Sequence, residues 1–171
     1  MEEEIINRVA KSPLIVFDLE DYYPEGVRKG IDLSDWLWEG LILREKDFRA
    51  ALSAHDWSQY QDFYIYLYCS TDAIIPGWSY SLVTMHLAPY AKKVIIGSED
   101  NLNTMIYQEI LAGLDYSIYQ DKPLIIKGCS KKAVPENALV MACQHLQPVA
   151  RSIMFGEACS TVPLYKKPSK K

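Results

Sequence analysis

The sequence lacks any apolar run of about 18 residues, the length that a membrane-spanning helix needs. It also lacks a glycine-rich phosphate loop, since Gly97 and Gly156 follow their apolar runs as isolated glycines. Its formal net charge is −4, so it has no general basic character of the kind that binds nucleic acid. We therefore expect no membrane span and no nucleic-acid partner.

Cysteine is scarce, and none of the four cysteines forms the Cys-x-x-Cys pair that is typical of zinc fingers. The sequence begins with acidic residues at positions 2–4, which is wrong for a signal peptide and predicts a cytoplasmic protein. Because the cytoplasm is reducing, we expect free thiols rather than structural disulfides. The cysteines are then packing residues, metal ligands or reactive thiols.

Composition and length predict a single globular domain over residues 1–171. The chain is 49% hydrophobic and 23% charged, which is ordinary for a globular protein with a buried core. The expected segments are 1–55, N-terminal strands and a cover; 56–101, a first repeat; 102–163, a second repeat with its connecting helix; and 164–171, a basic tail.

Two stretches of the chain resemble each other over most of their length. Residues 56–62 (DWSQYQD) and 115–121 (DYSIYQD) each precede an apolar run that ends at Cys-Ser. We infer duplication of a unit of about 60 residues; the alternative is that βαβ units share turn and cap chemistry. The matched positions include Cys69 and Cys129, Pro76 and Pro135, His86 and His145, and Gly97 and Gly156.

Each copy has the pattern strand–helix–strand, and a helix joins the copies. This pattern predicts an α/β fold: a parallel or mixed sheet with flanking helices, built from two tandem βαβ repeats plus an N-terminal extension. Within the extension we expect strands near residues 28–33 and 41–44. We expect the first strands of the two copies to be neighbours in one sheet, where the strand order reverses.

Three cysteines follow predicted strands, and on this topology they leave the same edge of the sheet. They are Cys69, Cys129 and Cys159; Asp72 lies in the first cysteine loop, and Asp100 is the position in the first copy that matches Cys159. Three thiols with one carboxylate form a set that zinc or iron would accept. The first hypothesis is therefore binding of a metal ion or small ligand at a cysteine-lined crevice.

Two alternatives stay open. In one, the cysteines are packing residues of a non-enzymatic interaction or regulatory module, which acts on a protein partner or forms a homo-oligomer. In the other, Cys69 is a reactive thiol, but a nucleophile needs a nearby base. His86 and His145 are expected at the far ends of their helices, near the opposite edge of the sheet, where their positive charge would complement the helix dipole.

Two motifs resemble a known family. CSTDAIIPGW at residues 69–78 and GEACSTVP at residues 156–163 are similar to segments of an uncharacterised family of Bacteroidetes-type bacteria, known only as domain of unknown function 2480. The resemblance extends over nearly the whole chain. It implies a cytosolic bacterial protein and assigns no activity, cofactor or partner.

Overall fold

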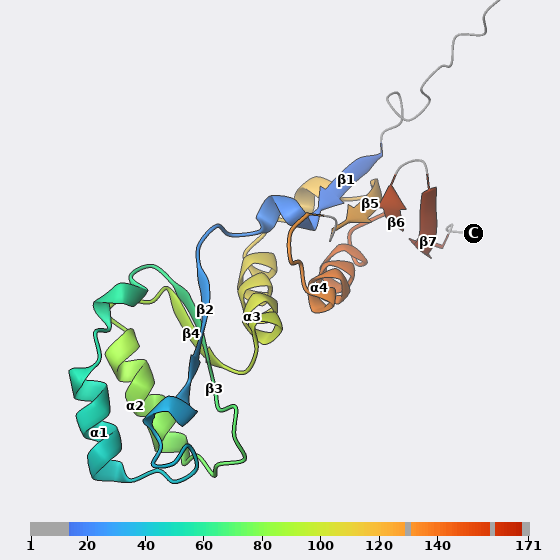
Figure 1. Ribbon diagram of the computed structural model, residues 1–171. Helices are drawn as coiled ribbons and strands as arrows, with labels where there is room; N and C mark the ends of the chain where they lie inside the picture. Colours follow the sequence, from blue (N-terminus) through green and yellow to red (C-terminus); the bar gives the residue numbers. More distant parts are fainter. Residues whose placement is uncertain (1–13, 129–130, 158–159, 169–171) are drawn as a thin grey trace, which may run out of the picture. The chain divides into compact units, whose positions relative to one another are not determined.

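The computed structural model describes residues 14–128, 131–157 and 160–168 (Figure 1). It confirms an α/β fold in which helices accompany parallel and mixed β-sheets. The chain divides into two compact units: unit 1, Met1–Tyr23 with Thr104–Lys171, and unit 2, Pro24–Asn103. That residues 1–171 act as one domain stays a prediction.

Unit 2 is built on a parallel sheet with the strand order β2-β3-β4. Asp32 at the end of β2 pairs with Tyr68 at the end of β3, so both strands finish at the same edge of the sheet. β2 confirms the strand that was expected near residues 28–33. The elements are β2 (Arg28–Asp32), η2 (Leu33–Trp36), α1 (Glu45–Ala54), η3 (Ser58–Tyr60), β3 (Tyr64–Tyr68), α2 (Gly77–Leu87) and β4 (Lys93–Ile96).

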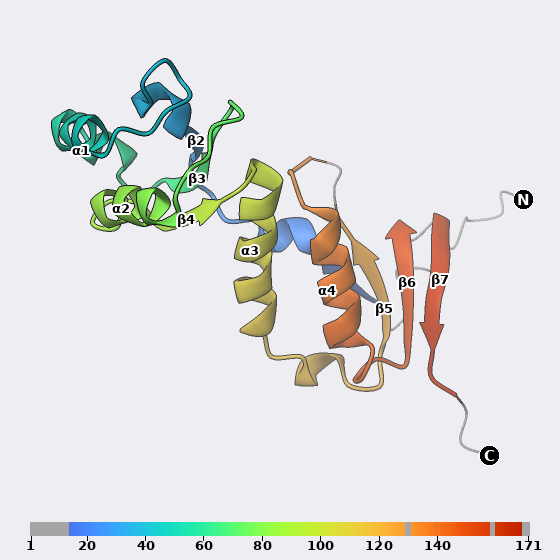
Figure 2. The same ribbon diagram turned by 90° about the horizontal axis from the view of Figure 1, so that it is seen from below.

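Helices α1 and α2 cover one face of this sheet (Figures 1 and 2). Ile65 and Leu67 of β3 point to that face and are fully buried. They share one core with Phe48 of α1 and Val83 of α2. Full burial of each such side chain contributes about 1.5–3 kcal/mol. Because strand side chains alternate, the three tyrosines of β3 lie on the opposite face.

Unit 1 has a four-stranded sheet with the order β1-β5-β6-β7, in which β7 alone runs antiparallel to its neighbour. Tyr107 is fully buried in this unit and donates its hydroxyl to the Leu19 carbonyl at 2.7 Å. The elements are β1 (Ile15–Asp18), η1 (Leu19–Tyr22), α3 (Glu99–Ala112, in this unit from Thr104 onward), η4 (Ser117–Tyr119), β5 (Pro123–Lys127), α4 (Glu136–Leu146), β6 (Ser152–Glu157) and β7 (Ser160–Lys166).

The expectation that the first strands of the two copies are neighbours in one sheet is wrong. β3 pairs with β2 and β4, whereas β5 pairs with β1 and β6. Each copy instead takes one strand of the N-terminal extension as its parallel partner. Backbone hydrogen bonds on both sides of β3 and β5 are therefore satisfied within two separate sheets.

The two copies share unusual backbone conformations at matched positions. Asp62 and Asp121 have φ of 62° and 55°, and Gly97 and Gly156 have φ of 140° and 116°. The Asp62 amide donates to the Tyr90 carbonyl, and the Asp121 amide donates to the carbonyl of residue 149. Donor and acceptor in the second copy each lie 59 positions after their counterparts in the first copy. This agreement supports tandem duplication of a βαβ unit, which stays a prediction.

Gly156, near the end of β6, has a backbone conformation that only glycine adopts easily. A Cβ atom at Gly156 would lie 2.6 Å from the Ser160 carbonyl oxygen, and the φ of 116° is unfavourable for any residue with a side chain. Gly156→Ala should therefore lower the free energy of unfolding by about 2 kcal/mol, measured by urea denaturation. Gly77→Ala is the control, because a Cβ there meets nothing within 4 Å. Equal stability of Gly156→Ala and the wild type would contradict this geometry.

Candidate functional site

One carboxylate joins the end of β2 to the loop that follows β3. Asp32 Oδ1 accepts the backbone N–H of Ser34 at 2.9 Å and that of Ser70 at 3.1 Å. The first hydrogen bond caps η2, and the second fixes the start of residues 69–76, here named the cysteine loop. The Ser34 and Ser70 hydroxyls lie 3.2 Å apart. Asp32 thus holds two adjacent segments of the carboxyl edge of the sheet together.

Asp32 stays ionised because its hydrogen bonds outweigh its burial. Burial acts to raise its pKa, but the hydroxyl and amide of Ser70 and of Ser34 together hold the pKa below the usual value of 3.8. Tyr80 of α2 lies close enough to this edge for its pKa to be affected by the charges there. Burial, with added repulsion from Cys69 and Asp32, raises the pKa of Tyr80. The edge therefore carries a fixed negative charge.

The thiol of Cys69 takes part in a short hydrogen-bonded chain. Its Sγ lies 3.4 Å from Thr71 Oγ1, and the Thr71 hydroxyl donates to the Gly40 carbonyl at 2.6 Å. Because that hydroxyl hydrogen is already used, the Cys69 thiol is the donor to Thr71. Thr71 thus tethers the cysteine loop to the segment that contains Gly40, and the half-buried thiol of Cys69 supports the Thr71 hydroxyl from within the loop.

That segment, residues 37–42, is a tight hairpin and is named here the apolar hairpin. The Trp38 amide donates to the Ile42 carbonyl at 2.9 Å, and the Leu41 amide donates back to the Trp38 carbonyl at 3.1 Å. Glu39 and Gly40 both have positive φ, 50° and 70°, which is typical of a type I′ turn. The strand expected near residues 41–44 is wrong; its apolar residues form one isolated bridge instead of a ladder.

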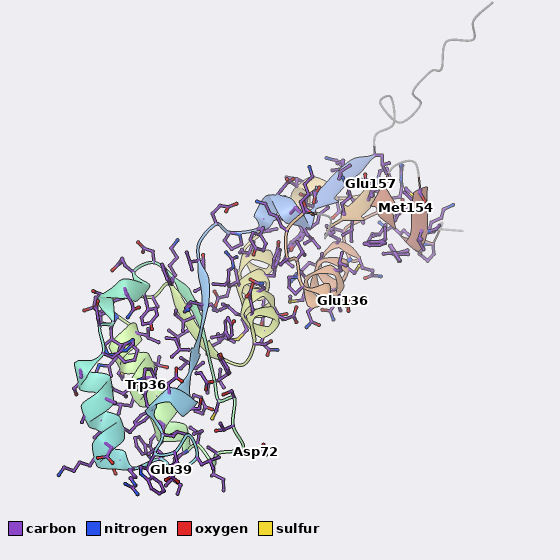
Figure 3. The ribbon with its side chains drawn as sticks, in the orientation of Figure 1. Trp36, Glu39, Asp72, Glu136, Met154 and Glu157 are labelled. Atoms are coloured by element: carbon purple, nitrogen blue, oxygen red, sulfur yellow. The ribbon has the colours of Figure 1, made fainter. Side chains whose placement is uncertain are left out.

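The apolar hairpin and the cysteine loop surround a hollow of about 430 Å³, named here the apolar hollow. Ile74 is 90% exposed, Leu41 53% and Ile42 50%, so large apolar side chains face solvent around it. Figure 3 labels Glu39 on the hairpin and Asp72 on the loop. The lining includes Leu41, Ile42, Leu43, Asp72, Ile74 and Pro76.

Three of the five predicted ligand residues belong to the part of the chain that the structure describes. Cys69 and Asp72 both lie in the cysteine loop of unit 2, and Asp100 lies in the first turn of α3. Cys129 and Cys159 lie outside the described residues. Among the residues that are described, no three His, Cys, Asp or Glu side chains form a group that could hold a metal ion. The separate sheets also remove the argument that brought Cys69 and Cys129 to one edge.

The histidines are helix-end residues, as the sequence predicts. His86 and His145 lie in the last turns of α2 and α4. His86 stacks on Trp57 at 5.2 Å between ring centroids, and His145 stacks on Tyr116 at 5.0 Å. Each ring therefore packs on the segment that leads into the strand before its own helix, β3 for His86 and β5 for His145, and not on the cysteine loop.

Asp32 is a residue of the site that was not expected from the sequence. The signal was present: Asp-Leu-x-Asp followed by an aromatic residue occurs at residues 18–22 and again at 32–36. Asp18 accepts the Glu20 amide at 3.0 Å, just as Asp32 accepts the Ser34 amide. A short acidic motif directly after an apolar strand is a cap signal, and here it marks the strand that pairs with each copy.

Removal of the Asp32 carboxylate should destabilise unit 2 in a pH-dependent way. Asp32→Ala loses two hydrogen bonds and should lower the free energy of unfolding by about 1–2 kcal/mol near neutral pH. Because the folded pKa is lowered, this contribution is fully present above the unfolded pKa of about 3.9 and is lost as the pH falls through the folded value.

The measurement is chemical denaturation of wild type and variant as the pH is lowered from neutral to below 3. Asp35→Ala, which removes a nearby exposed carboxylate, is the control and should have a much smaller effect. A difference between wild type and Asp32→Ala that grows on acidification would contradict the assignment.

Among the described residues, no helix is long and apolar enough to cross a membrane.

Comparisons with known proteins give a family and no activity. No curated protein and no solved structure matches the chain significantly. A family profile described as "Protein of unknown function (DUF2480)" matches residues 3–167. The chain therefore belongs to the DUF2480 family of proteins of unknown function.

Proposed function

We propose that this protein is an interaction module that self-associates through the apolar hollow of unit 2. The observation that carries the proposal is the exposure of large apolar side chains around one hollow, led by Ile74 at 90%. Contiguous apolar surface on a folded protein is a common mark of an interaction site. Here it comes from two tethered segments, which do not contribute these side chains to the core.

The apolar hollow is preorganised for contact. Glu39 and Gly40 hold the type I′ turn, and Thr71 bonds the turn to the cysteine loop through the Gly40 carbonyl. The loop in turn is bonded to Asp32 through Ser70. Little conformational entropy remains to be lost at this surface on association, which favours binding.

A second copy of the chain is the occupant that the surrounding charges favour. A two-fold dimer places one patch against itself, so charged residues around the patch find partners only if both signs of charge are present. Glu39 and Asp72 supply negative charge, while Arg44 supplies positive charge and lies over the Trp38 ring at 3.9 Å. Arg44 of one copy can therefore pair with an acidic residue of the other around an apolar centre.

Ile74→Asp should break the dimer without unfolding the protein. Ile74 contributes little to the core, so its replacement should leave the melting temperature almost unchanged, whereas a buried carboxylate at the dimer interface would be unpaired. Sedimentation equilibrium should give the wild type twice the 19.6 kDa chain mass at about 100 µM, and Ile74→Asp the mass of one chain.

Met85→Asp is the matched control, because Met85 of α2 is 66% exposed and does not line the hollow. It should remain dimeric. A wild type that is monomeric at every concentration, or a dimer that Ile74→Asp leaves intact, would overturn the proposal.

Binding of a metal ion or small ligand at the cysteines is a second, separate hypothesis. The observation in its favour is that Cys69 is a half-buried thiol outside any disulfide, directly after β3 and three positions before Asp72 in the same loop. The proposed ligands are Cys69, Cys129 and Cys159, with Asp72 or Asp100 as an auxiliary, and the metal would be zinc or iron. In the cytoplasm, the expected location, these thiols would stay reduced.

Elemental analysis of protein purified without a metal-affinity tag separates this hypothesis from packing cysteines. One zinc or iron per chain, lost in Cys69→Ala together with stability, would support a metal site. Sub-stoichiometric metal in the wild type, with Cys69→Ala as stable as the wild type, would reject it. Cys143→Ala is the control thiol, since Cys143 lies within α4.

A further inference from the structure

A second hollow, in unit 1, has a different chemistry from the apolar one. A cavity of about 570 Å³ lies where the end of β7 passes the start of β6, and it is named here the basic cavity. This volume is within the range of small-molecule sites, about 300–1,000 Å³. Its polar lining comprises Gln120, Asp121, Arg151, Ser152, Lys166 and Lys167.

The basic cavity carries a net positive charge in a chain whose formal net charge is −4. Three cations and one carboxylate line it, which leaves two positive charges. Lys167 Nζ lies 3.5 Å from Asp121 Oδ1, so the carboxylate is already neutralised. Within the described part of the chain, no ion pair engages Arg151 or Lys166. These two side chains are available to a dianion.

Backbone hydrogen bonds fix the frame on which these side chains are mounted. The Arg151 amide donates to the Lys122 carbonyl, and the Arg151 carbonyl accepts the Lys167 amide, both at 2.9 Å. Ser152 pairs with Lys166 in the β6–β7 ladder. The backbone that carries both free cations is therefore held from two sides, whereas the side chains remain exposed to an incoming ligand.

We propose that the basic cavity binds a small soluble molecule that carries a phosphate monoester. The planar guanidinium of Arg151 can make two parallel hydrogen bonds to phosphate oxygens, and Lys166 can add a point charge. The Ser152 hydroxyl and the Gln120 amide supply neutral donors. Because the cavity is larger than a phosphate ion, it has room for the organic part of the ligand. This proposal does not depend on the apolar hollow.

The probes are inorganic phosphate, AMP and its phosphate-free counterpart adenosine, with affinities measured by isothermal titration calorimetry on the full chain. AMP and phosphate should bind, and adenosine should not. Arg151→Gln and Lys166→Gln should each weaken AMP binding by about tenfold, because each removes a charge-assisted contact. Asp121→Asn should bind at least as tightly as the wild type, because it removes a negative charge and releases Lys167.

Lys46→Gln is the matched control, because Lys46 is an exposed lysine of α1 in the other unit. It should bind AMP like the wild type, and the melting temperatures should show that all four variants are folded. Equal affinity of Arg151→Gln and the wild type would overturn the proposal. So would binding only to vesicles that contain phosphatidic acid, or only to a single-stranded oligonucleotide, with no binding of soluble phosphate or AMP.

Discussion

The arrangement of the apolar hairpin and the cysteine loop in unit 2 depends on the two hydrogen bonds that the carboxylate of Asp32 accepts. By accepting the amides of Ser34 and Ser70, it connects the ends of two neighbouring parallel strands. The cysteine loop that starts there is then bonded through Thr71 to the turn of the apolar hairpin. Hydrogen bonds thus connect the end of β2 to the cysteine loop, and the cysteine loop to the backbone of the apolar hairpin. That surface is held in place because its two segments are hydrogen-bonded to the end of a strand whose side chains are buried in the core.

The element order and much of the local structure could be predicted from the sequence. The apolar residues Phe48 and Leu52 are four positions apart in the sequence, as one face of a helix requires, and both are buried in the core beneath α1. The position of the cysteine loop followed from the apolar run that it terminates, and the histidines were placed correctly at the ends of α2 and α4. These features are determined by residues that are close in sequence, so periodicity and cap chemistry suffice.

Sheet pairing and the apolar hairpin could not be predicted in the same way. Two similar strands can be neighbours, or each can pair with a different N-terminal strand, and the hydrophobic pattern is the same in both cases. The repeated Asp-Leu-x-Asp motif would have favoured the second arrangement. In the apolar hairpin, Trp38, Leu41 and Ile42 face solvent rather than a core, so they follow neither the helical nor the strand period.

The proposed sites lie on segments that extend each unit beyond its parallel strands. Unit 2 adds the apolar hairpin beside the carboxyl edge of its sheet, and unit 1 adds β7 with the basic residues that follow. In the proposed dimer, the apolar hollow of one chain meets the apolar hollow of a second chain. Isotope-filtered NMR of an equal mixture of labelled and unlabelled chains tests it most directly, through contacts between methyl groups of different copies. We predict intermolecular NOEs from Ile74 of one copy to Leu41 or Ile42 of the other. Intermolecular NOEs that involve only other surfaces, or none at all, would contradict the account.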